Sequence, residues 1–200
     1  GLTTVLVPNC GWSLPDEMPA GQSSAEDSGP IRVLWVGRFS RQKRLEWLLD
    51  VAEECSEFAF EVVGAATANS RYASRLMRRA SRIPNVIIHG WVPYSEMARY
   101  YCRCRILCCT SAYEGFPNTF LEAWSHGIPV VSTFDPDNLV TDKGLGKIGH
   151  TTGELIRWIR YLLAFADEWR KISQSARAYF TDNHTEERVL QQFERVLCNV

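Results

Sequence analysis

The hydrophobic positions of this chain form short apolar runs that alternate with longer amphipathic stretches. From residue 31 onward the runs lack the strict alternation of a strand with one solvated face, and they read in order IRVLWV, FAFEVV, NVIIH, RILCC and IPVVS. Helical spacing of apolar residues separates the runs at Leu45–Ala52, 69–82, 94–103 and from about 117, and three more helical stretches follow residue 150. Strands buried on both faces with helices between them are typical of a parallel sheet. The pattern therefore predicts an α/β domain, a parallel sheet with helices on both faces.

The first thirty residues have a different character. Residues 3–7, TTVLV, predict a short strand, and residues 9–30 are rich in Pro, Gly, Ser and acidic residues, as is typical of a linker. We expect residues 1–30 to be the end of a preceding domain with an interdomain linker, and residues 31–200 to be one globular domain. The chain begins without Met or a signal-peptide pattern, so we expect it to be part of a longer protein.

Composition narrows the classes of partner and compartment. Two hundred residues with 46% hydrophobic and 22% charged content suit one soluble domain, and no apolar run approaches the length of a membrane span. A net charge of −1 gives no overall attraction to nucleic acid, so we expect no nucleic-acid partner. Seven cysteines, an odd number set among apolar residues, favour reduced thiols in a cytoplasmic protein.

Two patterns that could suggest a metal have simpler interpretations. Four cysteines gather at Cys102, Cys104, Cys108 and Cys109. The run RILCC reads as a buried strand, however, on which the last two would point to opposite faces and could not bind one zinc ion together. Asp135-Pro136-Asp137 is commonplace in turns. We predict no metal site.

Small residues close each predicted strand, at the edge where parallel sheets bind ligands. They are Gly37, Gly64, Gly90, Ser111 and Ser132. Small side chains allow a ligand to approach the backbone closely, although turns alone also favour them.

The loop after the first strand, GRFSRQK, carries a candidate anion site. Ser40 is the predicted helix N-cap, which would place Arg41, Lys43 and Arg44 in the first helical turn, where the helix dipole disfavours cations. An anion on the exposed amides, held by Arg38 and Lys43, would reverse that penalty. The alternative is an ordinary solvated basic turn.

A second candidate lies in EGFPNTFLE, where two carboxylates stand eight positions apart. On one continuous helix, Glu114 and Glu122 would lie ~12 Å apart along the axis and roughly 80° apart around it, so they would not share a face. Pro117 suits the first helical position, which leaves Glu114 on the preceding loop. The amides of Asn118 and Thr119 would then point toward an anion between the carboxylates. The layout fits a nucleotide-sugar, whereas either glutamate alone would be read as an ordinary surface residue.

In the order and spacing of these motifs, the chain resembles the retaining glycosyltransferases of family 4, enzymes of the GT-B fold with two Rossmann-like domains. The resemblance rests on GRFSRQK, on E-GFPNTFL-E and on the GIPVV strand after it, and runs from about residue 31 to the end. It implies the C-terminal half of a GT-B enzyme, a Rossmann-like domain that binds a nucleotide-sugar donor. The chain departs from the family where Gly64 is followed by Ala65 and Ala66, and where FDPDNLV replaces a Gly-rich turn.

Residue by residue, the resemblance implies that Arg38 and Lys43 hold the diphosphate, that Glu122 holds the ribose hydroxyls and that Glu114 lies at the donor sugar. These implied catalytic residues are Glu114, Arg38 and Lys43. The implied donor-binding residues are Gly37, Arg38, Lys43, Gly90, Trp91, Val92, Glu114, Gly115, Phe116, Asn118, Thr119 and Glu122. Among them, Gly90, Trp91 and Val92 fall where the family contacts the base.

The expected function is transfer of a hexose from a UDP- or GDP-linked donor to a hydroxyl acceptor, in polysaccharide or glycolipid synthesis, with no cofactor. The acceptor site is expected in a missing N-terminal domain, so residues 1–200 alone should be inactive. Two alternatives stay open. One is half of a nucleotide-sugar epimerase of the same fold, and the other is a nucleotide-sugar binding module without catalysis.

The predicted helix 69–82 carries five arginines and no acidic residue. They are Arg71, Arg75, Arg78, Arg79 and Arg82. A solvated face is the first interpretation, and contact with an anionic membrane or a lipid-linked acceptor is the second. The second would make the protein peripheral at the inner face of the membrane.

Overall fold

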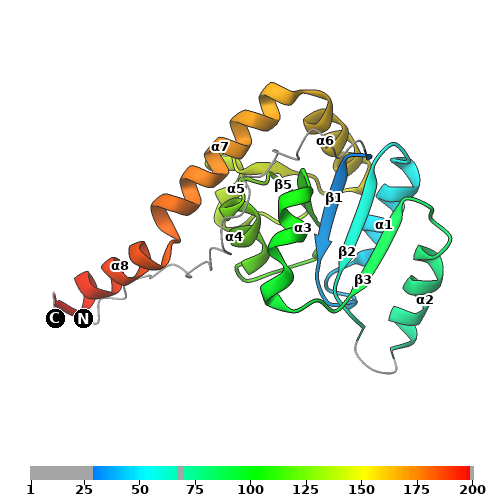
Figure 1. The fold of residues 1–200 in the computed structure, drawn as a ribbon, viewed down its shortest axis with the longest axis horizontal. Helices are drawn as coiled ribbons and strands as arrows, with labels where there is room; N and C mark the ends of the chain where they lie inside the picture. Colours follow the sequence, from blue (N-terminus) through cyan, green and yellow to red (C-terminus); the bar gives the residue numbers. More distant parts are fainter. Residues whose placement is uncertain (1–28, 67–69, 199–200) are drawn as a thin grey trace.

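The computed structural model describes residues 29–66 and 70–198, which form a parallel sheet between layers of helices (Figure 1). The sheet has six strands in the order β3-β2-β1-β4-β5-β6. Their bounds are β1 Arg32–Val36, β2 Ala59–Val63, β3 Val86–Gly90, β4 Ile106–Cys109, β5 Val130–Ser132 and β6 Gly146–Ile148. Neighbouring strands of this sheet pair in parallel, so the predicted α/β class is confirmed. The predicted strand at residues 3–7 and all but the last two residues of the predicted linker lie outside the described residues.

Two hydrophobic cores lie on the two faces of this sheet. One is formed with α1 Leu45–Glu54, α2 Arg71–Ala80 and α6 Thr152–Ala164, and the other with α3 Ala98–Arg103, α4 Asn118–Ser125 and α5 Leu139–Asp142. The long helix α7 Ala166–Asn183 contributes Trp169 to the first core and Phe180 to the second, and α8 Glu186–Cys198 follows it. Short 3₁₀ turns, η1 Tyr94–Glu96 and η2 Pro136–Asn138, complete the described elements. No helix in this part of the chain is both long and apolar enough to cross a membrane.

The two patterns that could suggest a metal have structural explanations. Cys108 lies in the core with α1, whereas Cys109 packs against the core with α4, so the two thiols point to opposite faces as predicted. The Asp135 carboxylate accepts the amide hydrogens of Val140 at 2.7 Å and Thr141 at 3.2 Å. This residue therefore satisfies amides in the first turn of α5. Within residues 29–66 and 70–198, no three His, Cys, Asp or Glu side chains are grouped so that they could hold a metal ion.

The predicted helix start at Ser40 is wrong. Residues 41–44 form a turn, α1 begins at Leu45, and Arg44 is its N-cap residue in a left-handed conformation with φ 46°. The Ser40 carbonyl accepts the amide hydrogen of Lys43 at 3.1 Å. The basic residues therefore precede the helix rather than occupy its first turn. Pro117 is likewise the N-cap of α4 rather than its first residue.

Candidate functional site

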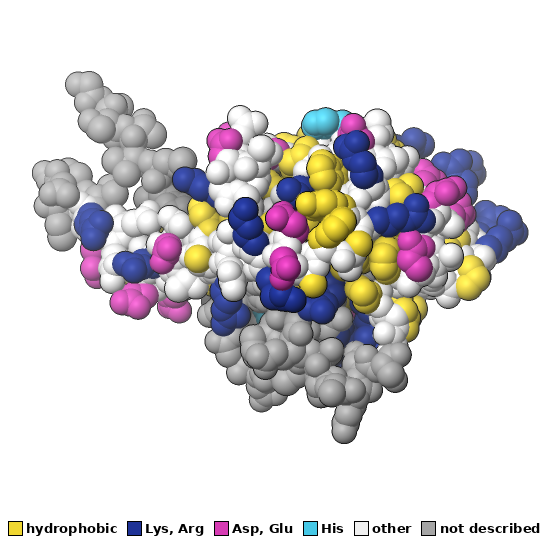
Figure 2. All heavy atoms as spheres, turned by 90° about the horizontal axis from the view of Figure 1, so that it is seen from above, with side chains coloured by type: hydrophobic (Ala, Val, Ile, Leu, Met, Phe, Trp, Pro, Cys, Tyr) yellow, Lys and Arg dark blue, Asp and Glu magenta, His cyan; other side chains and the backbone are white. Residues whose placement is uncertain are grey.

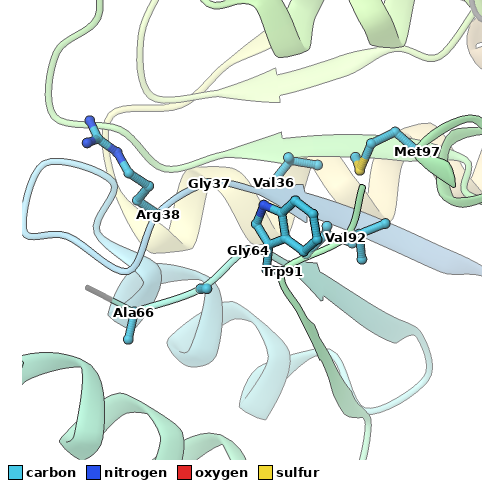
Figure 3. Close-up of a pocket in the computed structure, with 10 residues that line it drawn as sticks. Val36, Gly37, Arg38, Gly64, Ala66, Trp91, Val92 and Met97 are labelled. Atoms are coloured by element: carbon cyan, nitrogen blue, oxygen red, sulfur yellow. The ribbon is translucent and has the colours of Figure 1, made fainter. Parts of the chain in front are cut away.

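The main candidate pocket lies at the carboxyl edge of the sheet, where the loops after β1, β2 and β3 meet (Figure 3). It has a volume of about 400 Å³. Its lining is Val36, Gly37, Arg38, Val63, Gly64, Ala65, Ala66, Trp91, Val92 and Met97. Figure 3 shows Trp91 beside Val92 at one end, with Arg38 extended at the other. The indole of Trp91 is 73% exposed, so an apolar ring face is open to a ligand there.

The floor of this pocket is backbone, because three strand ends approach one another closely. The Gly37 amide donates to the Val63 carbonyl at 3.0 Å, and the Gly64 amide donates to the Gly90 carbonyl at 2.8 Å. Gly64 has φ +141°, and a Cβ placed there would lie 1.8 Å from the carbonyl oxygen of Gly37. Only glycine fits this position, both sterically and conformationally.

Sequence reasoning found only part of this lining. The predicted residues that line the pocket together are Gly37, Arg38, Trp91 and Val92. Gly90 contributes to the pocket floor, because its carbonyl accepts the amide hydrogen of Gly64. The loop of Ala65 and Ala66 was left without a predicted contact, yet both residues line the pocket. Met97 was not predicted. Its only signal in the sequence is that it is apolar and lies a few positions after Gly90, Trp91 and Val92.

The loop after β1 is joined to the loop after β4. Lys43 Nζ lies 2.5 Å from Glu114 Oε1, and the two side chains are only 19% and 12% exposed. The Ala112 amide donates to the Gln42 carbonyl at 2.7 Å, and the Gln42 side-chain amide donates to the Tyr113 carbonyl at 2.9 Å. The two loops thus form one surface.

The Arg44 side chain stabilises this contact between the loops after β1 and β4. Its guanidinium donates to the carbonyls of Thr110 at 2.7 Å and Ser111 at 2.9 Å, and to the Thr133 hydroxyl at 3.0 Å. These bonds explain the left-handed backbone of Arg44, because they hold the side chain beneath β4 while the helix starts one residue later. The sequence had predicted Arg44 in the first helical turn, beside the candidate anion site. It is a structural residue. Arg38 and Arg41 of this loop are both exposed and form no ion pair within the described residues, but only Arg38 lines the pocket, whereas the Arg41 guanidinium lies over the Tyr72 ring.

Glu122 lies one turn inside α4 and faces α3. Its Oε2 accepts a hydrogen bond from the Tyr101 hydroxyl at 2.5 Å. Burial raises the pKa of the Glu122 carboxyl, and the hydrogen bond from Tyr101 opposes that rise. Burial also raises the pKa of Tyr94 to about 12, with a further contribution from nearby Glu122.

The two clusters form one site. A Cβ placed on Gly37, which lines the pocket, would lie 3.3 Å from Lys43 Cδ, so the stem of the paired lysine runs across the pocket's edge. The start of α4 completes the site, since no side chain caps it and Asn118 is exposed there. An uncapped helix start offers amide hydrogens to an anion. Gly115, Phe116 and Thr119 lie in the same loop and first turn, beside Glu114.

Residues 30–175 match the family described as Glycosyl transferases group 1. The chain belongs to this family. It is 34% identical over 113 residues to the lipopolysaccharide 1,6-galactosyltransferase of Salmonella typhimurium, an alignment that covers 54% of this chain and 31% of that protein. The matched part thus spans less than a third of this relative.

Solved structures share the fold of this chain. Anabaena HepE, solved in complex with UDP and glucose, superposes with a TM-score of 0.76 at 22% identity, covering 86% of this chain and 49% of that one. Sucrose-phosphate synthase from Thermosynechococcus elongatus gives a TM-score of 0.81 at 22% identity, covering 98% and 52%. The expected fold is confirmed, namely that of the C-terminal half of a GT-B glycosyltransferase, and the chain spans about half the length of these neighbours.

Proposed function

We propose that this domain binds the donor of a retaining glycosyltransferase of family 4, which transfers a hexose from a nucleotide diphosphate sugar to a hydroxyl group. The observation that carries the proposal is the single carboxyl edge that bears the Trp91 pocket, the Lys43–Glu114 pair and Glu122. Two comparisons support it: a relative is named as a galactosyltransferase, and a structural neighbour was solved with UDP and glucose.

The lining of the pocket suits the base and ribose of the donor. Trp91 offers an exposed aromatic face, and Val92 and Met97 add apolar contacts, so a planar base can stack there. Glu122 is the proposed acceptor for the ribose hydroxyls, because a carboxylate accepts from two neighbouring hydroxyls at once. The base is then held by stacking and by the backbone, with UDP and GDP as the two candidate carriers.

The neighbouring loops suit the diphosphate and the sugar. Arg38, Lys43 and the amides at the start of α4 would bind the diphosphate, whose negative charge grows as the glycosidic bond breaks. They would therefore stabilise the transition state more than the bound donor. Glu114 would face the sugar, where positive charge develops. It acts either as nucleophile or as a stabiliser of that charge while the acceptor attacks on the leaving-group face.

The proposed reaction places no metal or cofactor in this domain. The acceptor and its base belong to the half of the enzyme outside this chain, consistent with a chain that spans about half of its structural neighbours. The acceptor class proposed is a growing polysaccharide or glycolipid.

The deciding experiment uses the full-length protein with UDP-glucose, UDP-galactose and GDP-mannose. We expect one nucleoside diphosphate to bind by calorimetric titration, and its sugar to appear on an added glycan acceptor with the anomeric configuration of the donor. Inverted product would remove the retaining assignment. A changed sugar without an acceptor would favour an epimerase, and binding without any turnover would favour a binding module. Residues 1–200 alone should bind the nucleotide and transfer no sugar.

A second observation supports a location at the membrane. Four arginines of α2 and its C-terminal end follow at spacings of four, three and four residues: Arg71, Arg75, Arg78 and Arg82. Such spacing places them within an arc of roughly 60°, opposite the buried side of the helix. All four are exposed, whereas Arg79 is held by Asp50 at 2.6 Å and Glu53 at 2.7 Å.

We propose that this arginine stripe contacts anionic lipid headgroups at the inner face of the membrane, near a lipid-linked acceptor. Lys and Arg side chains gather at the end of the molecule where Figure 1 places α2 (Figure 2). A straight row of cations on an outer helix fits a flat anionic surface, and each arginine near such a surface contributes about 1 kcal/mol.

A further inference from the structure

Tyr101 and Glu122 form a hydrogen bond, although 21 positions separate them. The tyrosine comes from α3 and the glutamate from α4. Tyr101 is fully buried, and its hydroxyl lies 2.5 Å from Glu122 Oε2. The other carboxylate oxygen, Oε1, forms no hydrogen bond within the described residues and is available to a ligand.

The tyrosine ring is itself fixed in place by a residue at the end of α4. The rings of Tyr101 and His126 are stacked with centroids 5.5 Å apart and planes 19° from parallel. His126 Nδ1 lies 2.8 Å from the main-chain carbonyl oxygen of Glu122, and the Ser125 hydroxyl donates to the same oxygen at 2.8 Å. The phenol is therefore aimed at the carboxylate by packing on both helices, as a residue that orients a binding group must be.

The environment of Glu122 makes this bond important. The described groups that face its side chain are Tyr101 from α3 and Tyr94 from η1, with His126 beside its main chain. No Arg or Lys of the described chain forms an ion pair with it. Burial disfavours the carboxylate form, and the hydrogen bond from Tyr101 is the contact that favours it. Without a cation nearby, one phenol hydroxyl carries this stabilisation.

We propose that Tyr101 is a positioning residue that keeps Glu122 ionised and aims its free oxygen at the ribose hydroxyls of the donor. The inference rests on the proposed role of Glu122 in binding nucleotide. An ionised carboxylate offers acceptors only, whereas a protonated one would present a donor to hydroxyls that need an acceptor. Nucleotide affinity should thus fall when Glu122 gains a proton, and Tyr101 sets the pH at which that happens.

The test is calorimetric titration of UDP, or of GDP if that is the nucleotide bound, into the full-length protein between pH 5 and pH 8. Tyr101→Phe removes the donor and keeps the ring stacked on His126. The matched control is Tyr100→Phe, because the neighbouring tyrosine is also buried but its hydroxyl contacts Arg99 at 3.0 Å instead. Each affinity is divided by the wild-type value at the same pH, so that titration of the nucleotide cancels.

Tyr101→Phe removes a hydrogen bond that favours the ionised form of Glu122, so the pKa of this carboxyl should rise. The carboxyl of Glu122 should hold its proton to higher pH in Tyr101→Phe, so binding is intact at pH 8 and is lost earlier as the pH falls. We expect affinity about three- to tenfold below wild type near the acid end and a ratio near one at pH 8. Tyr100→Phe should keep a ratio near one throughout.

Two further variants separate the possible failures. Glu122→Gln should bind UDP weakly at every pH, and adding Tyr101→Phe to it should change nothing more. If Glu122→Gln binds like wild type, the proposed nucleotide role of Glu122 fails. If it binds weakly while Tyr101→Phe shows a ratio that does not vary with pH, only the role of Tyr101 is overturned. Should Tyr101→Phe fail to fold, 3-fluorotyrosine at position 101, a stronger donor, should move the loss of binding to lower pH, and an unmoved profile would overturn the inference.

Discussion

Lys43 and Glu114 form an ion pair with 2.5 Å between Nζ and Oε1, across 71 positions of the chain. The pair joins the loop after β1 to the loop after β4. These two strands are neighbours at the point where the strand order reverses, and crevices at such points bind ligands in open parallel sheets. The cation proposed for the diphosphate and the carboxylate proposed for the sugar are therefore already side by side. The donor would share Lys43 with Glu114.

Arg38→Ala tests the diphosphate role most cleanly, because the exposed Arg38 side chain forms no ion pair within the described residues. The variant should weaken UDP binding by ~1.5–3 kcal/mol, the usual contribution of a charge-assisted hydrogen bond, and leave the melting temperature unchanged. Calorimetry and thermal unfolding measure the two quantities. Arg157→Ala on the distant helix α6 is the control, and equal affinities for both variants would remove Arg38 from the phosphate site.

Lys43→Ala should differ from Arg38→Ala in one respect. It removes a phosphate cation, so UDP binding should weaken by a similar ~1.5–3 kcal/mol. It also leaves the largely buried Glu114 carboxylate without its partner, so the unfolding free energy should fall by about 1–3 kcal/mol, and Lys43→Ala combined with Glu114→Ala should recover part of that loss. Chemical denaturation of the three variants gives the comparison. Strictly additive losses would contradict the coupling.

Substitutions of the two glutamates should have different effects, because each glutamate is proposed to contact a different half of the donor. Glu122→Gln should weaken UDP and UDP-sugar alike, because both carry the ribose hydroxyls. Glu114→Gln should bind UDP almost as wild type does and should lower kcat in the full-length enzyme, since a carboxylate near the anomeric carbon matters most when positive charge develops there. Both ligands are titrated against both variants. Equal loss of UDP affinity, with unchanged turnover for Glu114→Gln, would show that the assignment is wrong.

Gly64→Ala should be strongly destabilising. The new Cβ would lie 1.8 Å from the Gly37 carbonyl oxygen, and φ +141° is a conformation that side chains rarely adopt. We expect the unfolding free energy to fall by about 3 kcal/mol or more, with loss of nucleotide binding, because β1 and β2 must separate at the pocket floor. Gly153→Ala in the first turn of α6, where the Cβ would meet only Thr151 Oγ1 at 4.0 Å, should be neutral or slightly stabilising. Denaturant titration would refute the argument if both variants matched wild type.

The arginine stripe can be tested with vesicles. The full-length protein should co-sediment with vesicles containing phosphatidylglycerol, less so as salt is raised, and hardly with pure phosphatidylcholine. Replacing Arg71, Arg75, Arg78 and Arg82 by Gln should abolish most of this binding without changing UDP affinity. A control with Arg157, Arg170, Lys171 and Arg188 replaced by Gln carries the same charge change elsewhere. Equal sedimentation of the two quadruple variants would exclude the stripe as the membrane contact.

The periodicity of the chain alone determined the class of fold and the sheet edge at which the candidate site lies. Runs such as FAFEVV became strands, and the small residues after them lie at the carboxyl edge, because strand and helix periodicity and turn preference depend on neighbours within a few residues. The E-GFPNTFL-E spacing likewise placed one glutamate before a helix and one inside it. The positions of both glutamates relative to this helix therefore follow from local geometry.

Tertiary structure decided which of these residues touch. The sequence predicts Ser40 as the N-cap of α1, but the helix begins at Leu45. The reason is that Arg44 donates hydrogen bonds to the carbonyls of Thr110 and Ser111, which lie in a distant part of the chain. The Lys43–Glu114 pair and the contact of Gly64 with Gly37 have the same origin. They require β1 to lie between β2 and β4, with Val33 opposite both Phe60 and Ile106. Strand order and register arise from the packing of whole layers, so no local pattern records them, and the hydrogen bond from Tyr101 to Glu122 depends in the same way on how α3 packs beside α4.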